Sequence, residues 1–418
     1  MTATEQFVRD NARADVRQLA LRRPPDGVDL RWALQQIEGR QLAARKLPRW
    51  AATDDLWYPR RLSLEQCSSE ATAVYKRDLA ARLCSTPSCS PEQEATTLQE
   101  QTEDNLFVDL TAGLGVDFTA IAPLFGSSIY VERDHELCRL ARHNLPLLGL
   151  HDAQVREGQA EDFLAEDWQA TLIMIDPARR DTRGRKTVLI EDCTPDICSL
   201  QHLLRSHSRY AIIKLSPMLD IKAALRVLEN IVEVHVEGTE GECKELLFVM
   251  SGQSTRQQTS PSAASVPDIP IYCADGNHAL RFTYAEEAKA PLLLADSLQT
   301  YIYEPSATTM KAAPFRILGQ LFPGLKKLAP DTHLYTSDAL LPRFPGRTWR
   351  LLDHCSFAKA DLRRLLSGAT TAELSTRGFP LGVAALRRQL HLREGGEAHF
   401  IATTLSDGSR RLLKVEPV

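Results

Sequence analysis

The chain has 418 residues, with 50 Lys and Arg against 54 Asp and Glu, and a formal net charge of -4. This length exceeds the size at which one hydrophobic core usually stops growing, so two or three domains are expected. The composition is that of an ordinary globular protein, and no apolar run reaches the roughly 18 residues of a membrane span, which argues against a helical membrane protein.

The N-terminus, Met1-Thr-Ala-Thr-Glu-Gln, has neither the basic nor the apolar region of a secretory signal, so we expect a cytoplasmic protein. Nine cysteines are scattered along the chain without the paired spacing of a zinc site. This pattern predicts reduced thiols and no bound metal.

Charge is unevenly distributed along the chain. Residues 311–418 hold 17 Lys and Arg against 9 Asp and Glu, a balance of +8, so the remaining residues sum to -12. A basic C-terminal region suits a polyanionic partner such as RNA, because phosphate contacts supply affinity that does not depend on sequence. The alternative is a set of basic helices that are simply solvated.

Residues 1–86 are predicted to be helical, because apolar residues recur at helical spacing on both sides of Pro24-Pro25-Asp26-Gly27. A further helix follows Ser63–Glu70, where Ser or Thr side chains can cap it. Residues 84–105 are polar and lack an apolar face, which indicates a flexible connection.

Between residues 106 and 250, short apolar runs alternate with segments of helical length, which predicts an α/β sandwich. Seven strands are expected, at 106–109, 128–132, 153–157, 171–175, 210–215, 231–236 and 245–250. The last two are separated by only Gly238–Lys244, too few residues for a parallel crossover, so they should form an antiparallel hairpin. A Rossmann-like sheet with an antiparallel seventh strand is typical of class I methyltransferases rather than of nicotinamide-binding domains.

The remainder of the chain is predicted to hold a linker and two small α+β domains. Residues 251–267 are polar and low in apolar content, which indicates a linker. The stretch 268–345 has strand candidates near 280–284 and 301–303 and a helix candidate at 308–321. Residues 346–418 are predicted to contain strand, helix, strand and helix, and then a hairpin through Ser406-Asp407-Gly408.

A glycine turn follows the first predicted strand of the α/β domain. Gly113 and Gly115 lack Cβ atoms, so the backbone there can turn sharply and approach a ligand closely. Phe118 stands where a dinucleotide fingerprint has its third glycine, and an acid, Asp109, precedes Gly113 by four residues. Both features favour S-adenosylmethionine over NAD, with a predicted pocket formed by Asp109, Thr111, Ala112, Gly113, Gly115 and Asp117.

Further cofactor contacts are predicted at the ends of the next two strands. Glu132 lies 23 residues after Asp109, where a carboxylate can accept hydrogen bonds from both ribose hydroxyls, and Arg133 follows it directly. After the third strand, Gly158-Gln159-Ala160-Glu161-Asp162 resembles an adenine-binding stretch, which adds Gln159 and Ala160 to the pocket. The group that reads the adenine amino group stays open between Gln159, Glu161 and Asp162.

The predicted acceptor site is at the end of the fourth strand, where the sequence is Asp176-Pro177-Ala178-Arg179-Arg180. It resembles the Asp/Asn-Pro-Pro-aromatic motif of amino-group methyltransferases, in which the acid and a proline carbonyl accept hydrogen bonds from the substrate amine. The resemblance assigns catalytic roles to Asp176 and Pro177, although Ala178 and Arg179 depart from the motif. Arg179 and Arg180 are suited to phosphate contacts or form a solvated loop.

The fifth strand ends in Lys214-Leu215-Ser216-Pro217, close to the same rim. Lys214 is predicted either to contact substrate or to neutralise Asp176, while Ser216 and Pro217 are predicted substrate contacts. Neither acceptor segment contains a cysteine, so a mechanism that needs a nucleophilic thiolate is not favoured there.

Several segments resemble a family of bacterial methyltransferases with a ferredoxin-like insert and a C-terminal THUMP-like domain, the Porphyromonas type. The similar segments are 58–70, 176–180, 214–220, 303–305 and 375–380. Domains related to THUMP bind structured RNA in tRNA-modifying enzymes, so the resemblance implies a tRNA or rRNA substrate. It also places Gln66 and Ser69 in a segment that covers the cofactor, with helix capping as the alternative.

Three functions are compatible with these patterns. An RNA methyltransferase that acts on a base amino group agrees with the cofactor turn, the acceptor motif and the basic C-terminal region. A methyltransferase of a protein or small molecule is the first alternative. A non-catalytic RNA-binding protein with a degenerate cofactor pocket is the second, since Gln159 and Ala178 depart from common motifs.

Overall fold

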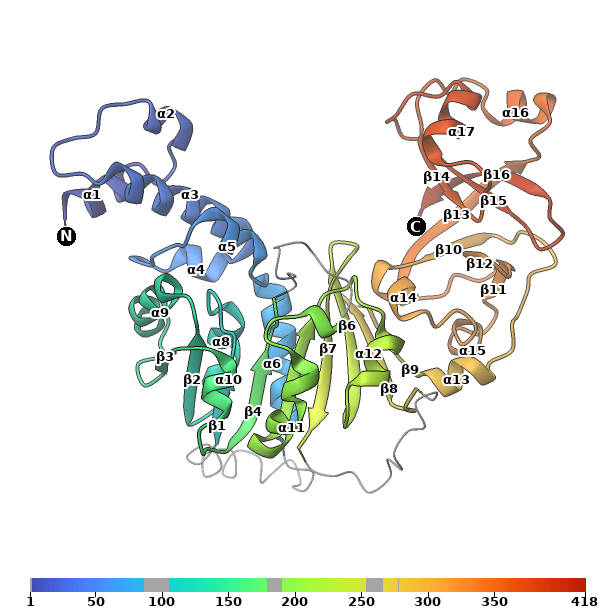
Figure 1. Cartoon of the computed structure of the whole chain (residues 1–418). Helices are drawn as coiled ribbons and strands as arrows, with labels where there is room; N and C mark the ends of the chain where they lie inside the picture. The colour runs from blue at the N-terminus through green and yellow to red at the C-terminus, as the bar shows by residue number, and fades with distance from the viewer. Residues whose placement is uncertain (1, 86–104, 179–189, 253–265, 277) are drawn as a thin grey trace, which may run out of the picture. The chain divides into compact units, whose positions relative to one another are not determined.

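The computed structural model describes residues 2–85, 105–178, 190–252, 266–276 and 278–418 (Figure 1). The chain forms two compact units, one of Met1–Val232 with Leu247–Ser265 and the other of Glu233–Leu246 with Val266–Val418. In the described part of the chain, no helix is long and apolar enough to cross a membrane.

The N-terminal region is helical, as predicted, and four of its helices, α1, α2, α3 and α6, begin at side-chain caps. Asp29 accepts a hydrogen bond from the Trp32 amide at the start of α3, and Ser69 does the same for Thr72 at the start of α6. Pro24-Pro25 lies between the second and third helices, where a helix cannot continue. The helices are α1 (Ala3–Asp10), α2 (Val16–Ala20), α3 (Leu30–Lys46), α4 (Pro48–Ala52), α5 (Arg61–Gln66) and α6 (Glu70–Cys84).

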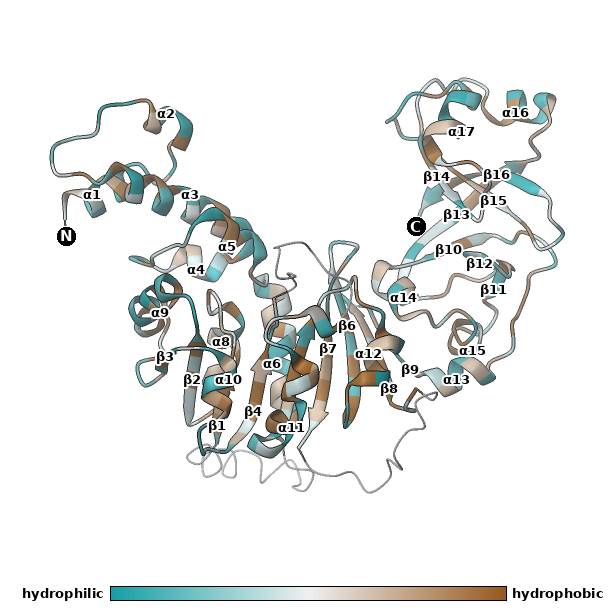
Figure 2. Ribbon diagram, viewed as in Figure 1, coloured by the Kyte–Doolittle hydropathy of each residue, from teal (hydrophilic) through white to brown (hydrophobic). Residues whose placement is uncertain are grey.

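The α/β part contains a sheet with the strand order β3-β2-β1-β4-β5-β7-β6-β8-β9. Its first five strands pair in parallel. Apolar residues are concentrated in these strands (Figure 2). The strands are β1 (Leu106–Asp109), β2 (Ser127–Glu132), β3 (Gln154–Glu157), β4 (Ala170–Ile175), β5 (Ser208–Leu215), β6 (Ile231–Thr239), β7 (Glu242–Ser251), β8 (Pro270–Asp275) and β9 (His278–Thr283).

The predicted hairpin is present, and its loop is shorter than expected. Only Glu240 and Gly241 separate β6 from β7, and both have positive φ, 56° and 77°. Two such residues are typical of a type I′ turn, whose twist matches that of the flanking strands. Strands β6 and β7 are therefore longer than the predicted ranges 231–236 and 245–250.

Helices cover both faces of the sheet. On one face α6, α8 (Val116–Ile121) and α9 (His135–Leu147) share a core with Phe107, Leu172 and Ile212 of the strands. In Figure 1, α10 (Ala160–Leu164), α11 (Ile197–His207) and α12 (Ile221–Val227) lie in front of the sheet. Two short 3-10 turns, Ala122–Leu124 and Ile190–Asp192, complete the described helical segments of this part.

Strands β8 and β9 extend the sheet beyond the seven strands that were expected. The sequence analysis placed them at the start of a separate domain from residue 268, but β8 pairs in parallel with β6, and β9 pairs with β8. The sequences of β8 and β9 are short and do not indicate which strand they pair with. Most of the expected linker, 253–265, and most of the expected flexible connection, 86–104, lie outside the described residues.

The C-terminal residues form a second sheet with the order β11-β12-β10-β13-β16-β15-β14. Antiparallel pairing of β10 with β13 joins the two predicted C-terminal domains in this one sheet. Its strands are β10 (Tyr301–Pro305), β11 (Lys326–Ala329), β12 (Thr332–Ser337), β13 (Gly346–Cys355), β14 (Glu373–Arg377), β15 (His399–Thr404) and β16 (Arg410–Pro417).

One predicted helix in this region is wrong. The expected helix at 308–321 is divided into α14 (Ala307–Ala312) and α15 (Leu318–Leu321). Ala313 adopts a left-handed conformation, with φ at 63°, and Pro314 follows, so the helix cannot continue. The other helices are α13 (Tyr284–Lys289), α16 (Lys359–Leu365) and α17 (Val383–Leu390), and the last two agree with the predicted order.

Candidate active site

The segments that follow β1 and β4 carry predicted site residues and lie where the strand order reverses direction. Strand β1 lies between β2 and β4, so the segments that follow β1 and β4 leave the sheet side by side. Open parallel sheets bind ligands at this position, beyond the carboxyl ends of their strands. Thr111 links the two segments, because its Oγ1 accepts a 2.6 Å hydrogen bond from the Asp176 amide.

The glycine turn after β1 is fixed to strand β2. Gly113 and Gly115 have φ values of 57° and 88°, and Gly115 precedes the first residue of α8. The Ala112 amide donates to the Val131 carbonyl, at 3.0 Å, and the Tyr130 hydroxyl donates to the Gly113 carbonyl. The turn is therefore held in a conformation that side chains with Cβ atoms rarely adopt.

The Glu132 carboxylate at the end of β2 accepts two backbone hydrogen bonds, each of 2.9 Å. Oε2 accepts from the Gly113 amide and Oε1 from the Asp134 amide. An ionised carboxylate has about four acceptor positions, so Glu132 can also accept bonds from a diol. The role of Glu132 toward a ribose stays a prediction.

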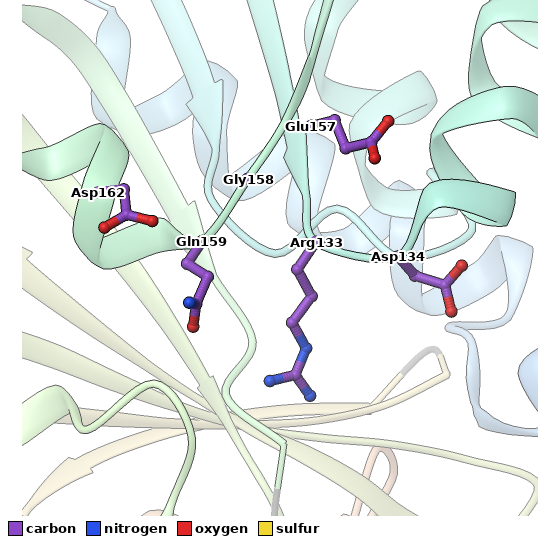
Figure 3. A pocket seen from close by; sticks show the side chains of 6 residues that line it. All are labelled: Arg133, Asp134, Glu157, Gly158, Gln159 and Asp162. Carbon is purple, nitrogen blue, oxygen red and sulfur yellow. The ribbon is translucent and has the colours of Figure 1, made fainter.

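An open depression lies beyond β2 and β3 (Figure 3). Its lining residues are Arg133, Asp134, Glu157, Gly158, Gln159 and Asp162. Of the three candidates for reading an adenine amino group, Gln159 and Asp162 line the depression, whereas Glu161 does not belong to its lining. Ala160 is the buried first residue of α10 and positions this segment rather than forming the surface.

Asp109 is buried, and its Oδ1 accepts a 3.1 Å hydrogen bond from the Thr111 amide. Burial raises the pKa of Asp109 well above its ordinary value, and the nearby Asp117 and Asp176 carboxylates raise it further. The Thr111 hydrogen bond and Lys214 act in the opposite direction without cancelling this increase. The raised pKa extends the pH range in which Asp109 is neutral beyond that of an ordinary aspartate.

Asp117 is surrounded by cationic and hydroxyl groups. Its Oδ2 accepts a 2.7 Å hydrogen bond from the Ser68 hydroxyl, and its Oδ1 lies 3.2 Å from Lys76 Nζ. Burial alone would raise the pKa of Asp117, but Lys76, Lys214 and Ser68 outweigh burial and lower it. Asp117 was predicted to contact cofactor, and the structure places its carboxylate in this buried cluster.

At the acceptor position, Lys214 Nζ lies 2.7 Å from Asp176 Oδ2. The Asp176 side chain is 43% exposed, whereas that of Lys214 is only 12% exposed. Of the two roles predicted for Lys214, neutralisation of Asp176 agrees with this geometry. Pro177 is buried next to the acid, and Arg179 and Arg180 lie outside the described residues.

The segment after β5 forms a tight turn beside Lys214. The Ser216 side chain is buried, and its Oγ accepts a 3.1 Å hydrogen bond from the Met218 amide. Pro217 is partly exposed and Met218 is exposed. The hydroxyl predicted to bind substrate thus accepts a hydrogen bond within the turn, and its contact with substrate stays a prediction.

The segment before α6 serves partly as a cap. Ser69 Oγ accepts a 3.2 Å hydrogen bond from the Thr72 amide, which is the capping alternative for this residue. Gln66 is exposed at the end of α5. The N-terminal helices pack against the glycine turn and the start of α8. The shared hydrophobic core includes Leu47, Trp50 and Tyr58 from the N-terminal region, and Leu114 and Val116.

Sequence reasoning missed Ser68 and Lys76, the two residues that contact Asp117 from the N-terminal region. A signal for Lys76 existed, because the buried residues of α6 include Ala73, Leu79 and Ala80, which lie on one helical face. Lys76 lies within that apolar face. A cation in such a position has to find a partner after burial.

Within the described residues, no group of three or more His, Cys, Asp or Glu is arranged to hold a metal ion. The described cysteines are free thiols.

Two family models match the C-terminal part of the chain. A ferredoxin-like domain model matches residues 301–345, and a THUMP domain-like model matches residues 346–417. Both matched regions fall in the second sheet, and their boundary lies at the start of β13.

Similar whole chains are found among solved structures and curated proteins. A crystal structure of a candidate methyltransferase from Porphyromonas gingivalis W83 is 32% identical, with a TM-score of 0.82, and the match covers 100% of this chain and 98% of that one. Two Mycobacterium tuberculosis proteins, from strains CDC 1551 and H37Rv, are named uncharacterized S-adenosylmethionine-dependent methyltransferases. Each is 26% identical over 307 residues, covering 72% of this chain and 78% of its own length.

Proposed function

Because this chain belongs to the family of S-adenosylmethionine-dependent methyltransferases with C-terminal ferredoxin-like and THUMP-like domains, we propose that it methylates RNA at an amino group of a base. The enzyme class and the cofactor follow from the family. The RNA substrate and the roles of individual residues are the proposal.

The residues beyond β1, β2 and β3 fit S-adenosylmethionine. Glu132 has acceptor capacity for the ribose hydroxyls, and the glycine turn beside it presents backbone without side chains. Gln159 and Asp162 line the adjacent depression, where an amide or carboxylate oxygen can accept a hydrogen bond from an adenine amino group (Figure 3). In this assignment Arg133 borders the nucleoside.

When bound, S-adenosylmethionine supplies a methyl group that its sulfonium already activates. The remaining task of the protein is to align an acceptor nitrogen and to stabilise the positive charge that develops on it. Asp176 and the Pro177 carbonyl are proposed to accept hydrogen bonds from the amine. The ion pair with Lys214 fixes the carboxylate in one orientation, while 43% exposure leaves it accessible to substrate.

The observation that carries the RNA proposal is a group of exposed cations in the THUMP-like region. Lys359 and Arg363 lie on α16, Arg388 lies on α17, and Arg393 follows that helix. All four, here called the basic helix cluster, are exposed and form no ion pair with any described residue. Leu365 of α16 and Leu386 of α17 belong to the same hydrophobic core. Unneutralised cations of this kind are suited to phosphate contacts.

The proposal is tested with full-length protein, labelled S-adenosylmethionine and total RNA from a strain that lacks this protein. We expect label in RNA, and nuclease digestion followed by mass spectrometry identifies the modified base. Incorporation into protein or small molecules instead of RNA would overturn the proposal and favour the alternative substrate classes.

A charge-reversal variant tests the basic helix cluster. Changing Lys359, Arg363, Arg388 and Arg393 to Glu should weaken RNA binding and reduce the slope of log affinity against log salt by about one for each lost phosphate contact. Arg22→Glu, an exposed arginine in the loop after α2, is the control. Equal RNA affinity and salt slope in the cluster variant and wild type would contradict the role of this surface.

A further inference from the structure

Lys76 is a cation in the interior of the methyltransferase part. It lies in the middle of α6, and its side chain is 0% exposed. A buried ammonium group loses its hydration, so it persists only where anionic or polar partners replace the water. The contacts of Lys76 therefore indicate what holds this charge in place.

The contacts of Lys76 lead toward the glycine turn. Its Nζ lies 3.2 Å from Asp117 Oδ1 and donates to Ser68 Oγ, also at 3.2 Å. Ser68 donates in turn to the other oxygen of Asp117, at 2.7 Å. Asp117 is the second residue of α8, the helix whose N-cap is Gly115. Lys76 thus joins α6 to the helix that begins at the cofactor turn.

The same aspartate connects Lys76 with the acceptor residues. Lys214 Nζ lies 3.8 Å from Asp117 Oδ2 and 2.7 Å from Asp176 Oδ2, and it also contacts Ser68 Oγ at 3.4 Å. Positive and negative groups therefore alternate in the order Lys76, Asp117, Lys214, Asp176. Two ammonium groups balance two carboxylates, and only the last member has a substantially exposed side chain.

We propose that Lys76 is a positioning residue for methyl transfer: by pairing with Asp117 it leaves Lys214 to hold Asp176 in the orientation that receives the acceptor. This inference rests on the proposed role of Asp176. Lys76 itself touches neither substrate nor cofactor in this arrangement. It acts through Asp117 and Lys214.

The effect of removing the Lys76 side chain can be predicted from the charged groups around Asp176. Among the described residues, Lys214 would then be the lysine that lies beside both carboxylates, and Asp117 and Asp176 would compete for its ammonium group. Either Lys214 moves toward Asp117, or one carboxylate takes up a proton at higher pH. Among the described residues, titratable groups that bear on this cluster are Asp109 from β1, Asp117 from α8, Asp176 after β4, Lys214 from β5 and the Cys67 thiol before α6.

The test uses Lys76→Met, the matched control Arg77→Met and the double variant Lys76→Met/Asp117→Asn. Arg77 is the next residue on α6, but it is exposed and pairs with Asp78. Removing both members of a buried pair is often neutral for stability, so the double variant remains informative even where the single variant fails to fold.

Methyl transfer to total RNA from a strain lacking this protein is measured in single turnover against pH, at saturating S-adenosylmethionine. We expect Lys76→Met to lose at least about tenfold in rate and to move the acid limb of the pH profile upward, with cofactor affinity nearly unchanged. Arg77→Met should match wild type, and the double variant should recover both the rate and the acid limb. A rate loss with an unchanged acid limb and no recovery would overturn the proposal.

A second readout separates this inference from the proposed function. Lysine labelled with ¹³C at Cε gives NMR signals for the ammonium groups, and comparison with Lys214→Met identifies the signal of Lys214. We expect Lys76→Met to shift this signal and its titration, and the double variant to restore them, whatever the substrate is. An unmoved Lys214 signal would overturn the inference, whereas absent RNA methylation by wild type would overturn only the proposed function.

Discussion

Lys214 Nζ lies 2.7 Å from Asp176 Oδ2, although Lys214 lies in β5, Asp176 follows β4, and the two residues are 38 positions apart in the sequence. The parallel pairing of these strands brings the two side chains together. Asp176, the acid of the predicted acceptor motif, thus forms an ion pair with Lys214 of the neighbouring strand. Its amide is held by Thr111 from the cofactor turn.

Asp176→Ala should abolish methyl transfer while leaving cofactor affinity within about threefold of wild type. The side chain contacts Lys214, and its position beyond β4 is that of the acceptor, not of the nucleoside. We expect a loss of at least about a hundredfold in rate, the scale of removing one preorganised stabilising group. Calorimetry with S-adenosylmethionine and single-turnover labelling measure the two quantities, and Asp176→Asn serves as the shape-matched control.

Glu132→Ala should produce the opposite pattern, with weaker cofactor binding as its main effect. Losing hydrogen bonds from a charged acceptor costs about 1.5–3 kcal/mol each, or at least about tenfold in Kd. Because Glu132 also binds the Gly113 and Asp134 amides, Glu132→Gln separates charge from the support of the turn. Finding the Asp176 and Glu132 phenotypes exchanged would contradict the site assignment.

The parts of the fold that follow local rules could be predicted from the sequence. Gly238–Lys244 is too short for a crossover, and the structure has a hairpin there. Asp109 and Glu132 are the last residues of β1 and β2, and Asp176 directly follows β4, so the order of these parallel strands was enough to place the three acids near one another. Ser406-Asp407-Gly408 likewise marked the turn between β15 and β16.

Long-range pairing could not be predicted in the same way. Strands β8 and β9 have ordinary strand sequences, and nothing local shows that β8 pairs with β6 rather than starting a new sheet. Lys76 and Asp117 are 41 positions apart, and only the packing of α6 against α8 reveals their ion pair. The sequence analysis therefore predicted a cofactor contact for Asp117 from its position in the glycine-turn motif. The contacts of its carboxylate with Lys76 and Ser68 depend on the tertiary structure.

Asp162→Ala should weaken S-adenosylmethionine binding more than Glu161→Ala. Both acids lie in the first turn of α10, but Asp162 lines the depression and Glu161 does not. A lost hydrogen bond to an adenine amino group is worth about 1 kcal/mol, or roughly fivefold in Kd. Gln159→Ala, measured in the same calorimetric series, shows whether the amide contributes as well, and a larger effect for Glu161→Ala would contradict this reading of the depression.

Asp109→Asn should stabilise the protein increasingly as pH rises above the ordinary pKa of an aspartate. The folded-state pKa of Asp109 is raised above its unfolded value of 3.8. The contribution of Asp109 to the stability of the wild type is therefore fully present below pH 3.8 and is lost as pH rises toward the folded-state pKa. The slope is about 1.4 kcal/mol per pH unit in that window. Asparagine is neutral throughout and retains an oxygen for the Thr111 amide. Denaturant unfolding without cofactor, between pH 5 and 8, measures the difference.

The pKa of Asp117 is shifted in the opposite direction to that of Asp109. Its pKa is lowered by Lys76, Lys214 and Ser68 in spite of burial, so its contribution to stability is present above the unfolded value and is lost as pH falls through the folded value. Asp117→Asn should therefore destabilise the protein at neutral pH, because it leaves Lys76 buried beside an uncharged amide. Parallel pH profiles for the Asp109 and Asp117 variants would show that the two carboxyl groups do not differ in protonation.

Gly115→Ala should reduce both stability and cofactor affinity, whereas Gly149→Ala should reduce stability alone. The two glycines have nearly equal φ values, 88° and 87°, so alanine costs each about 1–2 kcal/mol of backbone strain. They differ in their surroundings: a Cβ at Gly115 would lie 3.4 Å from Cε2 of Tyr130, while a Cβ at Gly149 meets no atom within 4 Å. That distance is an ordinary van der Waals contact, so the effect on cofactor comes from the backbone: Gly115 belongs to the cofactor turn, and relief of its strained φ shifts the neighbouring Gly113 carbonyl that Tyr130 holds, whereas Gly149 lies outside the turn. Thermal unfolding should therefore give similar losses for the two variants, and calorimetry with S-adenosylmethionine should show at least about tenfold weaker binding for Gly115→Ala only. Equal cofactor affinities would mean that the turn tolerates this displacement and that its glycines serve the backbone conformation alone.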